Sequence, residues 1–224
     1  MGAERLTADL GDALLDLDRR RRTGMPEAVY AAGKTPEQCR RIVEAFLAET
    51  GDPVIVTRTD AEHRAVLADL SPAGTWSGTL TWRHAPERTI RPVAIVSGGT
   101  SDQVVVDESA GTLTALGVPV LLVRDVGVAG LHRLLGQLGR LEDVSAIIAV
   151  AGMEAALPTV LAGLVRAPLI AVPTSVGYGT ALGGITALLS MLTSCAPGVS
   201  VVGIDNGYGA ACVATRIVSS RVER

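Results

Sequence analysis

The loop Ser97-Gly98-Gly99-Thr100-Ser101-Asp102 carries residue types that bind anions, and it follows an apolar run at 93–97. Adjacent glycines let the backbone approach a phosphate or ribose closely, while hydroxyls and the N-terminus of a following helix donate hydrogen bonds to it. The pattern is neither the dinucleotide-binding G-x-G-x-x-G nor the Walker A sequence. It predicts a phosphate or ribose site, with a tight turn capped by Asp102 as the structural alternative.

Polar residues and tyrosines also follow the other apolar runs of the C-terminal region. The candidates in these loops are Asp125, Gly152, Met153, Glu154, Thr174, Ser175, Tyr178, Asp205, Asn206 and Tyr208. Glu154 is expected in the first turn of a helix, where it either contacts a ligand or interacts with the helix dipole alone. The two tyrosines are flanked by glycines, which predicts stacking on a planar ligand or gating of it, with an exposed loop tip as the alternative.

Cys195 ends an apolar segment whose spacing predicts a buried helical face. The residues at intervals of three and four are Leu182, Ile185, Leu188, Leu189, Leu192 and Cys195. This pattern alone predicts a core thiol, and a position at a helix C-terminus disfavours a thiolate. Cys195 also immediately precedes Ala196-Pro197-Gly198 and the last predicted strand.

Five short apolar runs must position these loops. They lie at 93–97, 118–123, 146–150, 169–172 and 199–204, and each is followed by a loop and a helical segment. This alternation predicts an α/β fold, an open parallel sheet with helices on both faces joined by right-handed crossovers. The number of units favours the flavodoxin-like strand order. Ligands of such sheets bind beyond the carboxyl ends of the strands, where the loops above are expected.

The first 90 residues have a different character. Residues 1–90 contain 26 charged residues and residues 91–224 contain 17, which predicts a boundary near Arg91 between a small mixed α+β N-terminal module and a larger C-terminal domain. The elements expected in the module are a helix from Glu4 to Arg20 ending in the basic arm Arg19–Arg22, a capped helix start at Thr35–Gln38, strands at 54–56 and 79–82, and a helix from Asp60 between them.

Composition limits the class of protein. Hydrophobic residues make up 48% of the chain and mean hydropathy is +0.36, which excludes disorder as the main state. A net charge of -3 argues against a nucleic-acid partner. Prolines and glycines interrupt the longest uncharged stretch, 167–204, so no membrane span or signal segment is expected. The three widely spaced cysteines predict neither a disulfide framework nor a zinc site, and we expect a soluble cytoplasmic protein.

Several segments taken together resemble one known family. They are RTG at 22–24, EAVYAAGKTPEQ at 27–38, SGGTSD at 97–102, RDVGVAGLHRLL at 124–135, VAGMEAALPTVLAGLV at 150–165 and AVPTSVGYGTALGGITALLSMLTSCAPGVSVVGIDNGYGAA at 171–211. In this order they are similar to the LarB family, pyridinium-3,5-biscarboxylic acid mononucleotide synthases of nickel-pincer nucleotide cofactor biosynthesis. The resemblance covers residues 17–33 and nearly all of 91–218.

The same C-terminal region is more distantly similar to the aminoimidazole ribonucleotide (AIR) carboxylases of purine synthesis. The shared motifs are a G-S/T-x-S-D phosphate loop, an A-G-x-x-x-x-L-P segment and a V-P strand end. There the helix before the fifth strand ends in Met-Pro-x-Gly, whereas this chain has Ser194-Cys195-Ala196-Pro197-Gly198. A histidine after the second strand moves the proton in those enzymes. His132 matches it only loosely and is expected to face solvent.

A cysteine at this position suits the chemistry of a pyridinium ring. Aminoimidazole is electron-rich and attacks carbon dioxide directly, whereas a pyridinium ring is electron-poor and does not. The resemblance implies that the Cys195 thiolate adds to the ring and turns its neighbouring carbon into a nucleophile. It further implies that the substrate is nicotinic acid adenine dinucleotide, with CO2 or bicarbonate as co-substrate, and that hydrolysis of the phosphoanhydride then releases AMP.

Roles for individual residues follow from matching positions in the motifs. The resemblance implies that Glu154 contacts the pyridinium end or assists proton transfer. It assigns the phosphoribosyl part to Ser97–Asp102, Thr174 and Ser175. Further substrate contacts would come from Asp125, Gly152, Met153, Tyr178, Asp205 and Asn206. The basic arm, through Arg21, Arg22 and Lys34, would reach the AMP half, with a solvated helix end as the alternative.

The resemblance also implies partners and cofactors. A homo-oligomer is expected, an octamer by the family pattern. Mg²⁺ can assist the hydrolysis by polarising the phosphoanhydride, at a site that the sequence does not identify. Nickel is not expected to bind this protein, because the sequence has no His/Cys cluster. The alternatives are an aminoimidazole ribonucleotide carboxylase or mutase, and a non-catalytic nucleotide-binding protein.

Overall fold

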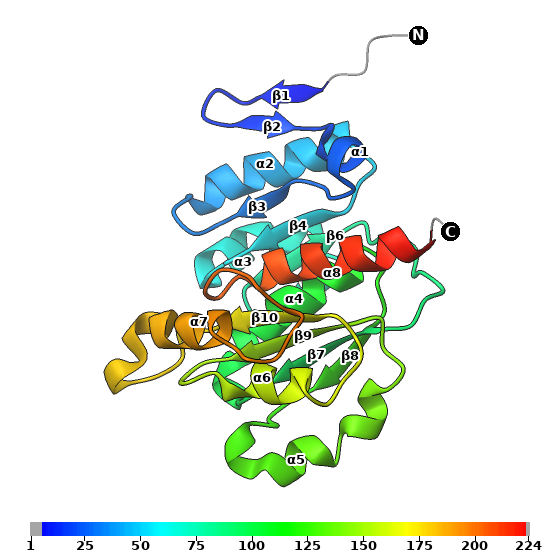
Figure 1. The fold of residues 1–224 in the computed structure, drawn as a ribbon. Helices are drawn as coiled ribbons and strands as arrows, with labels where there is room; N and C mark the ends of the chain where they lie inside the picture. The colour runs from blue at the N-terminus through cyan, green and yellow to red at the C-terminus, as the bar shows by residue number, and fades with distance from the viewer. Residues whose placement is uncertain (1–5, 223–224) are drawn as a thin grey trace.

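The computed structural model describes residues 6–222 and places two main sheets in a layered arrangement (Figure 1). The N-terminal elements are β1 (Thr7–Asp9), β2 (Leu14–Asp16), α1 (Arg19–Thr23), β3 (Ala28–Tyr30), α2 (Pro36–Glu49), β4 (Val54–Thr57), α3 (Ala61–Leu67), β5 (Gly74–Trp76) and β6 (Thr79–Trp82). The C-terminal elements are β7 (Val93–Ser97), α4 (Gln103–Ala115), β8 (Val120–Val123), α5 (Leu131–Leu135), β9 (Ala146–Ala151), α6 (Ala156–Ala162), β10 (Leu169–Pro173), α7 (Ile185–Leu192), β11 (Val199–Val201) and α8 (Gly207–Val222).

The C-terminal sheet is parallel throughout, in the order β11-β10-β9-β7-β8. This is the flavodoxin-like order, so the predicted fold class is confirmed. Every residue of β7, β9 and β10 is buried, as expected for strands that helices cover on both faces. From β7 the chain moves outward to β8 and then crosses back to β9. The strand order therefore reverses between β7 and β9.

The N-terminal module contains a four-stranded mixed sheet in the order β3-β4-β6-β5. Its strands β4 and β6 and helix α3, capped by Asp60, lie where the sequence predicts them. At the start of α2, the Thr35 hydroxyl accepts from the Gln38 N–H at 3.2 Å and the Gln38 side chain accepts from the Thr35 N–H at 2.9 Å. The predicted capping box is confirmed, and it fixes where α2 begins.

The helix expected from Glu4 to Arg20 is wrong over its described residues. Instead, β1 and β2 pair as an antiparallel hairpin, and α1 begins only at Arg19. Gly11 has a φ of 87° and its N–H donates to Asp9 Oδ1 at 2.8 Å. An aspartate followed two residues later by a left-handed glycine favours a turn over helix continuation, and hydrophobic spacing alone misses it. Glu4 itself lies outside the described residues.

Helix α4 lies between the two main sheets and belongs to both cores. It contacts β4, β5 and β6 on one side and β7 and β8 on the other, with α8 beside it (Figure 1). One hydrophobic cluster accordingly contains Met25 and Ile55 from the module together with Val93 and Ile95 from β7. Gly111 permits this approach, because a Cβ there would meet the Trp76 ring at 2.8 Å. Helices α6 and α7 cover the opposite face of the parallel sheet.

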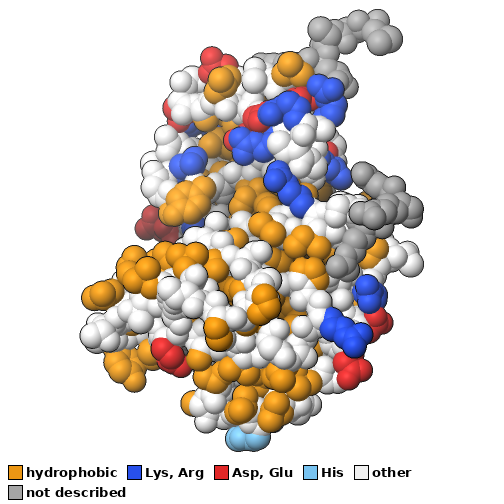
Figure 2. All heavy atoms as spheres, viewed as in Figure 1, with side chains coloured by type: hydrophobic (Ala, Val, Ile, Leu, Met, Phe, Trp, Pro, Cys, Tyr) orange, Lys and Arg blue, Asp and Glu red, His pale blue; other side chains and the backbone are white. Residues whose placement is uncertain are grey.

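The segment predicted as one helix from Leu182 to Cys195 is shorter and differently buried. Leu182 and Gly183 have left-handed backbone angles, and α7 runs only from Ile185 to Leu192. The apolar face predicted to be buried is instead exposed, at 67% for Leu182, 56% for Leu189 and 61% for Leu192. Figure 2 shows hydrophobic side chains gathered over this part of the surface. Among residues 6–222, no helix is long and apolar enough to cross a membrane.

Candidate active site

A cavity of about 280 Å³ lies at the carboxyl edge of the parallel sheet, where the strand order reverses. We call it the sheet-edge cavity. Its lining residues come from the loops after four strands: Gly98, Gly99, Ser101 and Asp102 after β7, Gly127, Val128 and Ala129 after β8, Ala151 to Leu157 at and after β9, and Val176 after β10. The sequence-predicted residues among them are Gly98, Gly99, Ser101, Asp102, Gly152, Met153 and Glu154.

Asp102 forms the floor of the sheet-edge cavity and is only 4% exposed. Its Oδ1 accepts from the Thr174 hydroxyl at 2.8 Å and its Oδ2 accepts from the Gly99 N–H at 3.0 Å. Burial raises the pKa of Asp102 above its ordinary value, and these two hydrogen bonds offset only part of that effect. Asp102 thus ties the loop after β7 to the loop after β10.

The backbone is strained around this edge of the sheet. Asp125, Met153, Ala155 and Asp205 all have φ between 53° and 57°, a region that non-glycine residues rarely adopt. Gly152 is a point of close approach, because a Cβ there would meet the Val176 carbonyl oxygen at 2.3 Å. Such strain concentrates at functional sites. Here it coincides with the close packing of the loops after β9 and β10.

The charged side chains that line the sheet-edge cavity are both acidic, Asp102 and Glu154. Glu154 is exposed and lies in the turn before α6, so the expectation that it belongs to the first helical turn is wrong by two residues. Ala155, with left-handed backbone angles, separates Glu154 from the helix. A cavity whose charged lining residues are both carboxylates favours a cationic or hydroxyl-rich ligand group over a bare anion.

Asp205 joins two loops but does not line the cavity. Its N–H donates to the Pro173 carbonyl and its Oδ1 accepts from the Ser175 N–H, both at 2.8 Å. Asn206 accepts from the Gly209 N–H at 2.7 Å and so caps the start of α8. Asp205 and Asn206 therefore stabilise the loops after β10 and β11 by contacts within a single chain.

The remaining predicted substrate contacts lie outside the lining of the sheet-edge cavity. Ser97 is buried at the end of β7, and Thr100 is exposed in the turn that follows it. Asp125 is exposed and pairs with Arg133 at 2.8 Å. Tyr178 is 82% exposed, which matches the loop-tip alternative. His132 is exposed on α5, as expected.

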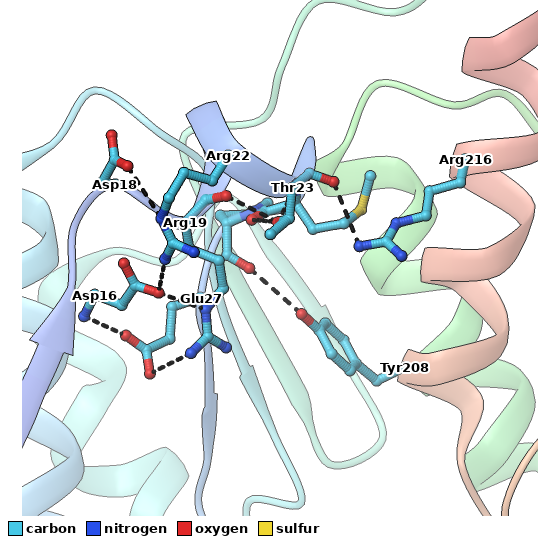
Figure 3. A network of polar contacts seen from close by, with 10 residues as sticks. Asp16, Asp18, Arg19, Arg22, Thr23, Glu27, Tyr208 and Arg216 are labelled. Carbon is cyan, nitrogen blue, oxygen red and sulfur yellow. Dashed lines mark hydrogen bonds and ion pairs between the residues drawn. The ribbon is translucent and has the colours of Figure 1, made fainter.

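Tyr208 does not line the sheet-edge cavity. It lies in the first turn of α8, and its hydroxyl donates to the Pro26 carbonyl at 3.4 Å (Figure 3). Burial raises the pKa of Tyr208. In this structure Tyr208 therefore joins α8 to the N-terminal module, and its predicted stacking or gating role stays a prediction.

Cys195 is exposed and lies in the segment between α7 and β11. The interpretation as a core thiol is therefore wrong. Because this segment precedes a parallel strand, it lies toward the amino end of the sheet, and Cys195 does not line the sheet-edge cavity. The neighbouring Ser194 hydroxyl contacts the Thr159 hydroxyl of α6 at 2.8 Å, which holds the segment against the body of the protein.

The basic arm lies in a network of ion pairs (Figure 3). Arg19 pairs with Asp16 and Glu27, Arg20 with Asp52, Arg21 with Asp18, and Arg22 with Asp16 and Asp18. Lys34 donates to the Tyr30 carbonyl at 2.9 Å. Arg20 and Arg21 line a separate cavity of about 570 Å³ in the module, which contains Asp18, Glu49 and Asp52 as well. That cavity is larger, but it is lined by two arginines and three carboxylates and is not at the switch point.

Sequence reasoning missed several lining residues, including Ala151 and Ala155 to Leu157 at and after β9. Gly127, Val128 and Ala129 line the cavity although none has a reactive side chain. A Cβ on Gly127 would meet the Gly98 carbonyl oxygen at 2.7 Å, so the glycine after the second strand was the available signal. Val176 contributes through the close approach of its backbone to Gly152, which no local pattern predicts.

The fold and the cavity together define the class of protein. They combine an open parallel sheet of this order with a glycine-rich loop, a buried aspartate and an A-G-x-x-x-x-L-P turn around one cavity. The chain belongs to the AIR carboxylase family, whose pattern matches residues 92–224. Residues 7–79 match the LarB/PurE-like N-terminal domain.

Individual relatives agree with this assignment. An uncharacterized protein of Methanocaldococcus jannaschii is 42% identical over 212 residues, which cover 88% of this chain and 80% of the relative. The N5-carboxyaminoimidazole ribonucleotide mutase of the same organism is 35% identical over 136 residues, 58% of this chain and 81% of the mutase. The corresponding mutase of Pyrococcus horikoshii is 34% identical over 134 residues, 56% of this chain and 71% of the mutase.

Proposed function

We propose that this protein carboxylates the pyridinium ring of nicotinic acid adenine dinucleotide and hydrolyses the phosphoanhydride to release AMP. The product would be pyridinium-3,5-biscarboxylic acid mononucleotide, the precursor expected for the nickel-pincer cofactor. Membership of the AIR carboxylase family and the LarB/PurE-like N-terminal domain support a carboxylase- or mutase-like activity. The observation that carries the finer proposal is an exposed thiol, Cys195, in a chain whose ligand cavity is lined by acidic charges alone.

The charge of the cavity suits a pyridinium ring. The ring carries a permanent positive charge, which the carboxyl groups of Asp102 and Glu154 would attract in a partly desolvated site. The phosphoribosyl part would extend along the loop of Gly98, Gly99 and Ser101, where the glycines let a ligand approach the backbone closely and the Ser101 hydroxyl can donate a hydrogen bond. A neutral aminoimidazole ring gains less from the same carboxylates.

The chemical sequence balances without an external oxidant. The Cys195 thiolate adds to the ring carbon beside the reacting one, and the ring loses its positive charge and its aromaticity. The neighbouring carbon then attacks CO2, and the new bond uses the electron pair of the resulting dienamine. A base, which we assign to Glu154, removes the proton from the carboxylated carbon. Expulsion of the thiolate restores the pyridinium ring.

The separation of Cys195 from the sheet-edge cavity requires a second copy of the chain. The thiol and the exposed leucines of α7 lie on neighbouring segments, and an unpartnered apolar face of this kind marks a subunit contact. In the proposed assembly, the thiol of one chain serves the cavity of another. The octamer expected from the family resemblance would provide such a contact.

The basic arm is the proposed site for the AMP half. The side chains of Arg21 and Arg22 are 69% and 53% exposed, so a phosphate can replace their present carboxylate partners. Lys34 would contribute a further positive charge. Within residues 6–222, no group of three or more His, Cys, Asp or Glu side chains could hold a metal ion. No step above depends on one.

The test is incubation with nicotinic acid adenine dinucleotide and labelled bicarbonate, followed by mass spectrometry. We expect label in the mononucleotide product and one AMP released per turnover. Cys195→Ala should abolish label incorporation, whereas Cys212→Ala, the matched control in α8, should retain it. Absence of both labelled product and AMP with the unaltered protein would disprove the proposal.

Mixing experiments test the role of the second copy. Cys195→Ala and Glu154→Gln chains should each be inactive, and reassembly of the two together should restore activity at sites that combine one intact thiol with one intact carboxylate. If mixed assemblies stay as inactive as the separate variants, the thiol does not serve a neighbouring cavity.

A second candidate is N5-carboxyaminoimidazole ribonucleotide mutase, because proteins of that name are 34% and 35% identical to this chain over its C-terminal region. It predicts turnover of the aminoimidazole substrate, and activity that survives Cys195→Ala. The dinucleotide assay and the cysteine variant together distinguish the two functions.

A further inference from the structure

Arg58 of the N-terminal module extends into the C-terminal region and contacts two of its elements. It follows β4 and has a φ of 60°, a left-handed conformation that non-glycine residues rarely adopt. Its Nε donates to Glu108 Oε1 of α4 at 2.9 Å, and its Nη2 donates to the backbone carbonyl of Asp205. The side chain of Glu108 is 5% exposed and that of Arg58 is 29% exposed, so this is a largely buried contact.

Glu108 also fixes the start of α8. Its Oε2 accepts from the Tyr208 N–H at 3.2 Å, one of the backbone donors that the first turn of a helix leaves unpaired. A buried carboxylate is costly unless a cation and hydrogen bonds accompany it. Arg58 is the cation paired with Glu108 in the part of the chain described by the structure. The module therefore supplies the charge that keeps this carboxylate in place.

Asp205 carries the contact onward to the sheet-edge cavity. Its side chain accepts from the Ser175 N–H, and the adjacent Thr174 hydroxyl donates to Asp102, which in turn accepts from the Gly99 N–H. These hydrogen bonds, linked through the backbone of Asp205 and of Thr174-Ser175, connect Arg58 to the glycine-rich loop. They join the loops after β11, β10 and β7, and they reach two residues that line the cavity.

We infer that Arg58 is a positioning residue for the ligand loops, and that the N-terminal module acts on the site through it. Arg58 touches neither the cavity nor any reacting atom. One planar group fixes both partners, because Nε and Nη2 donate to the two oxygens of Glu108 and Nη2 also donates to the Asp205 carbonyl, a geometry that a lysine ammonium does not reproduce. The kinetic test of this inference rests on the proposed function, because it measures turnover of the dinucleotide. A second test, by hydrogen–deuterium exchange, does not depend on that function.

The kinetic test separates positioning from folding by means of a double variant. Arg58→Gln leaves Glu108 buried without its cation, so it should both destabilise the protein and raise the KM for the dinucleotide, by roughly tenfold for a lost charged hydrogen bond, with a smaller change in kcat. Arg58→Gln with Glu108→Gln removes both charges. It should regain stability yet keep the raised KM. Arg58→Lys should recover only part of the loss, and Arg40→Gln, at a surface ion pair of the module, should leave KM unchanged.

Hydrogen–deuterium exchange of the ligand-free protein gives the second readout. The Ser175 amide should exchange faster in both Arg58→Gln and the double variant than in the unaltered protein, and at the unaltered rate in Arg40→Gln. A normal KM in the double variant, or an unchanged Ser175 amide, would show that Arg58 only stabilises the fold. If the unaltered protein does not turn over the dinucleotide, the proposed function fails, while the exchange measurement still decides the role of Arg58.

Discussion

The N-terminal module and the parallel-sheet region accommodate charge in opposite ways. In the module, arginines pair with aspartates and glutamates near the surface, as Arg20 does with Asp52 and Arg40 with Asp69. In the parallel-sheet region, the acidic residues Asp102 and Glu108 are buried, with only 4% and 3% of the surface of each whole residue exposed. Surface pairs contribute little to stability, whereas buried carboxylates are costly and persist only with specific partners.

This contrast shows that the buried carboxylates, which lower the stability of the fold, lie in the region that forms the site. Asp102 holds two ligand loops together, and Glu108 holds the start of α8 beside a third loop. The same region contains Asp125, Met153, Ala155 and Asp205 in left-handed conformations. Buried charge and backbone strain therefore coincide at the carboxyl edge of the sheet.

The largest effect is expected from Glu108→Gln. Loss of this carboxylate leaves Arg58 without its anion and weakens the cap of α8, which should lower the free energy of unfolding by about 3 kcal/mol, as for other broken buried pairs. Urea unfolding measures it. Glu44→Gln, which removes an exposed partner of Arg40, should cost less than about 0.5 kcal/mol. Equal losses in the two variants would remove the distinction between the regions.

Gly152→Ala should cost about 2 kcal/mol, because the new Cβ would lie 2.3 Å from the Val176 carbonyl oxygen and the backbone must shift. Thermal unfolding followed by circular dichroism measures the loss. Gly163→Ala is the matched control, since its Cβ would have its nearest neighbour at 3.5 Å. A Gly152→Ala protein as stable as the control would mean that the loops at this edge are not tightly packed.

Thr35→Ala should cost about 1 kcal/mol, the usual value for loss of an N-cap hydroxyl. Thr35→Ser keeps the accepting oxygen and should be nearly neutral. Because the capping box is local to the module, the loss should appear in unfolding experiments without any change in ligand binding at the sheet-edge cavity. A parallel loss of affinity would contradict the separation drawn here.

The smallest effect concerns the pH dependence contributed by Asp102. Burial raises its pKa in the folded protein, so the folded state holds this proton more tightly than the unfolded state does. Its contribution to stability is therefore greatest below the ordinary pKa of aspartate and falls as pH rises through that value to the raised one. Asp102→Asn lacks this titrating group. As pH rises through this range, the melting temperature of the unaltered protein should therefore fall relative to that of Asp102→Asn.

Comparison with the variant isolates this group, because other carboxylates titrate equally in both proteins. A melting-temperature difference that is constant with pH would show that Asp102 titrates normally in the folded state.

Much of the fold follows from local patterns in the sequence. The five strands of the parallel sheet and the capping box at Thr35 are recognisable because β-branched runs, turn residues and caps act over a few residues. The strand order was predicted from the number of strand–helix units. The glycine-rich loop was also predictable, since its position after the first strand determines its place in the sheet.

The misplaced parts depend on tertiary or quaternary contacts. The apolar spacing from Leu182 to Leu192 correctly indicates a surface that avoids water, but it does not tell whether the same chain or another copy covers it. Arg58 has no motif around it, and its role arises only when β4 and α4 come together. The β1–β2 hairpin replaced an expected helix because one turn outweighed hydrophobic spacing.

Helix α4 has a consequence for how the molecule comes apart. Its one side completes the core of the parallel sheet and its other side completes that of the module sheet, so neither sheet keeps an intact interior without it. A break in the connecting chain between 83 and 92 would not release two self-sufficient pieces. Heating should instead unfold both regions in a single cooperative transition. Loss of the module in evolution would first require polar residues on the side of α4 that packs against the module sheet.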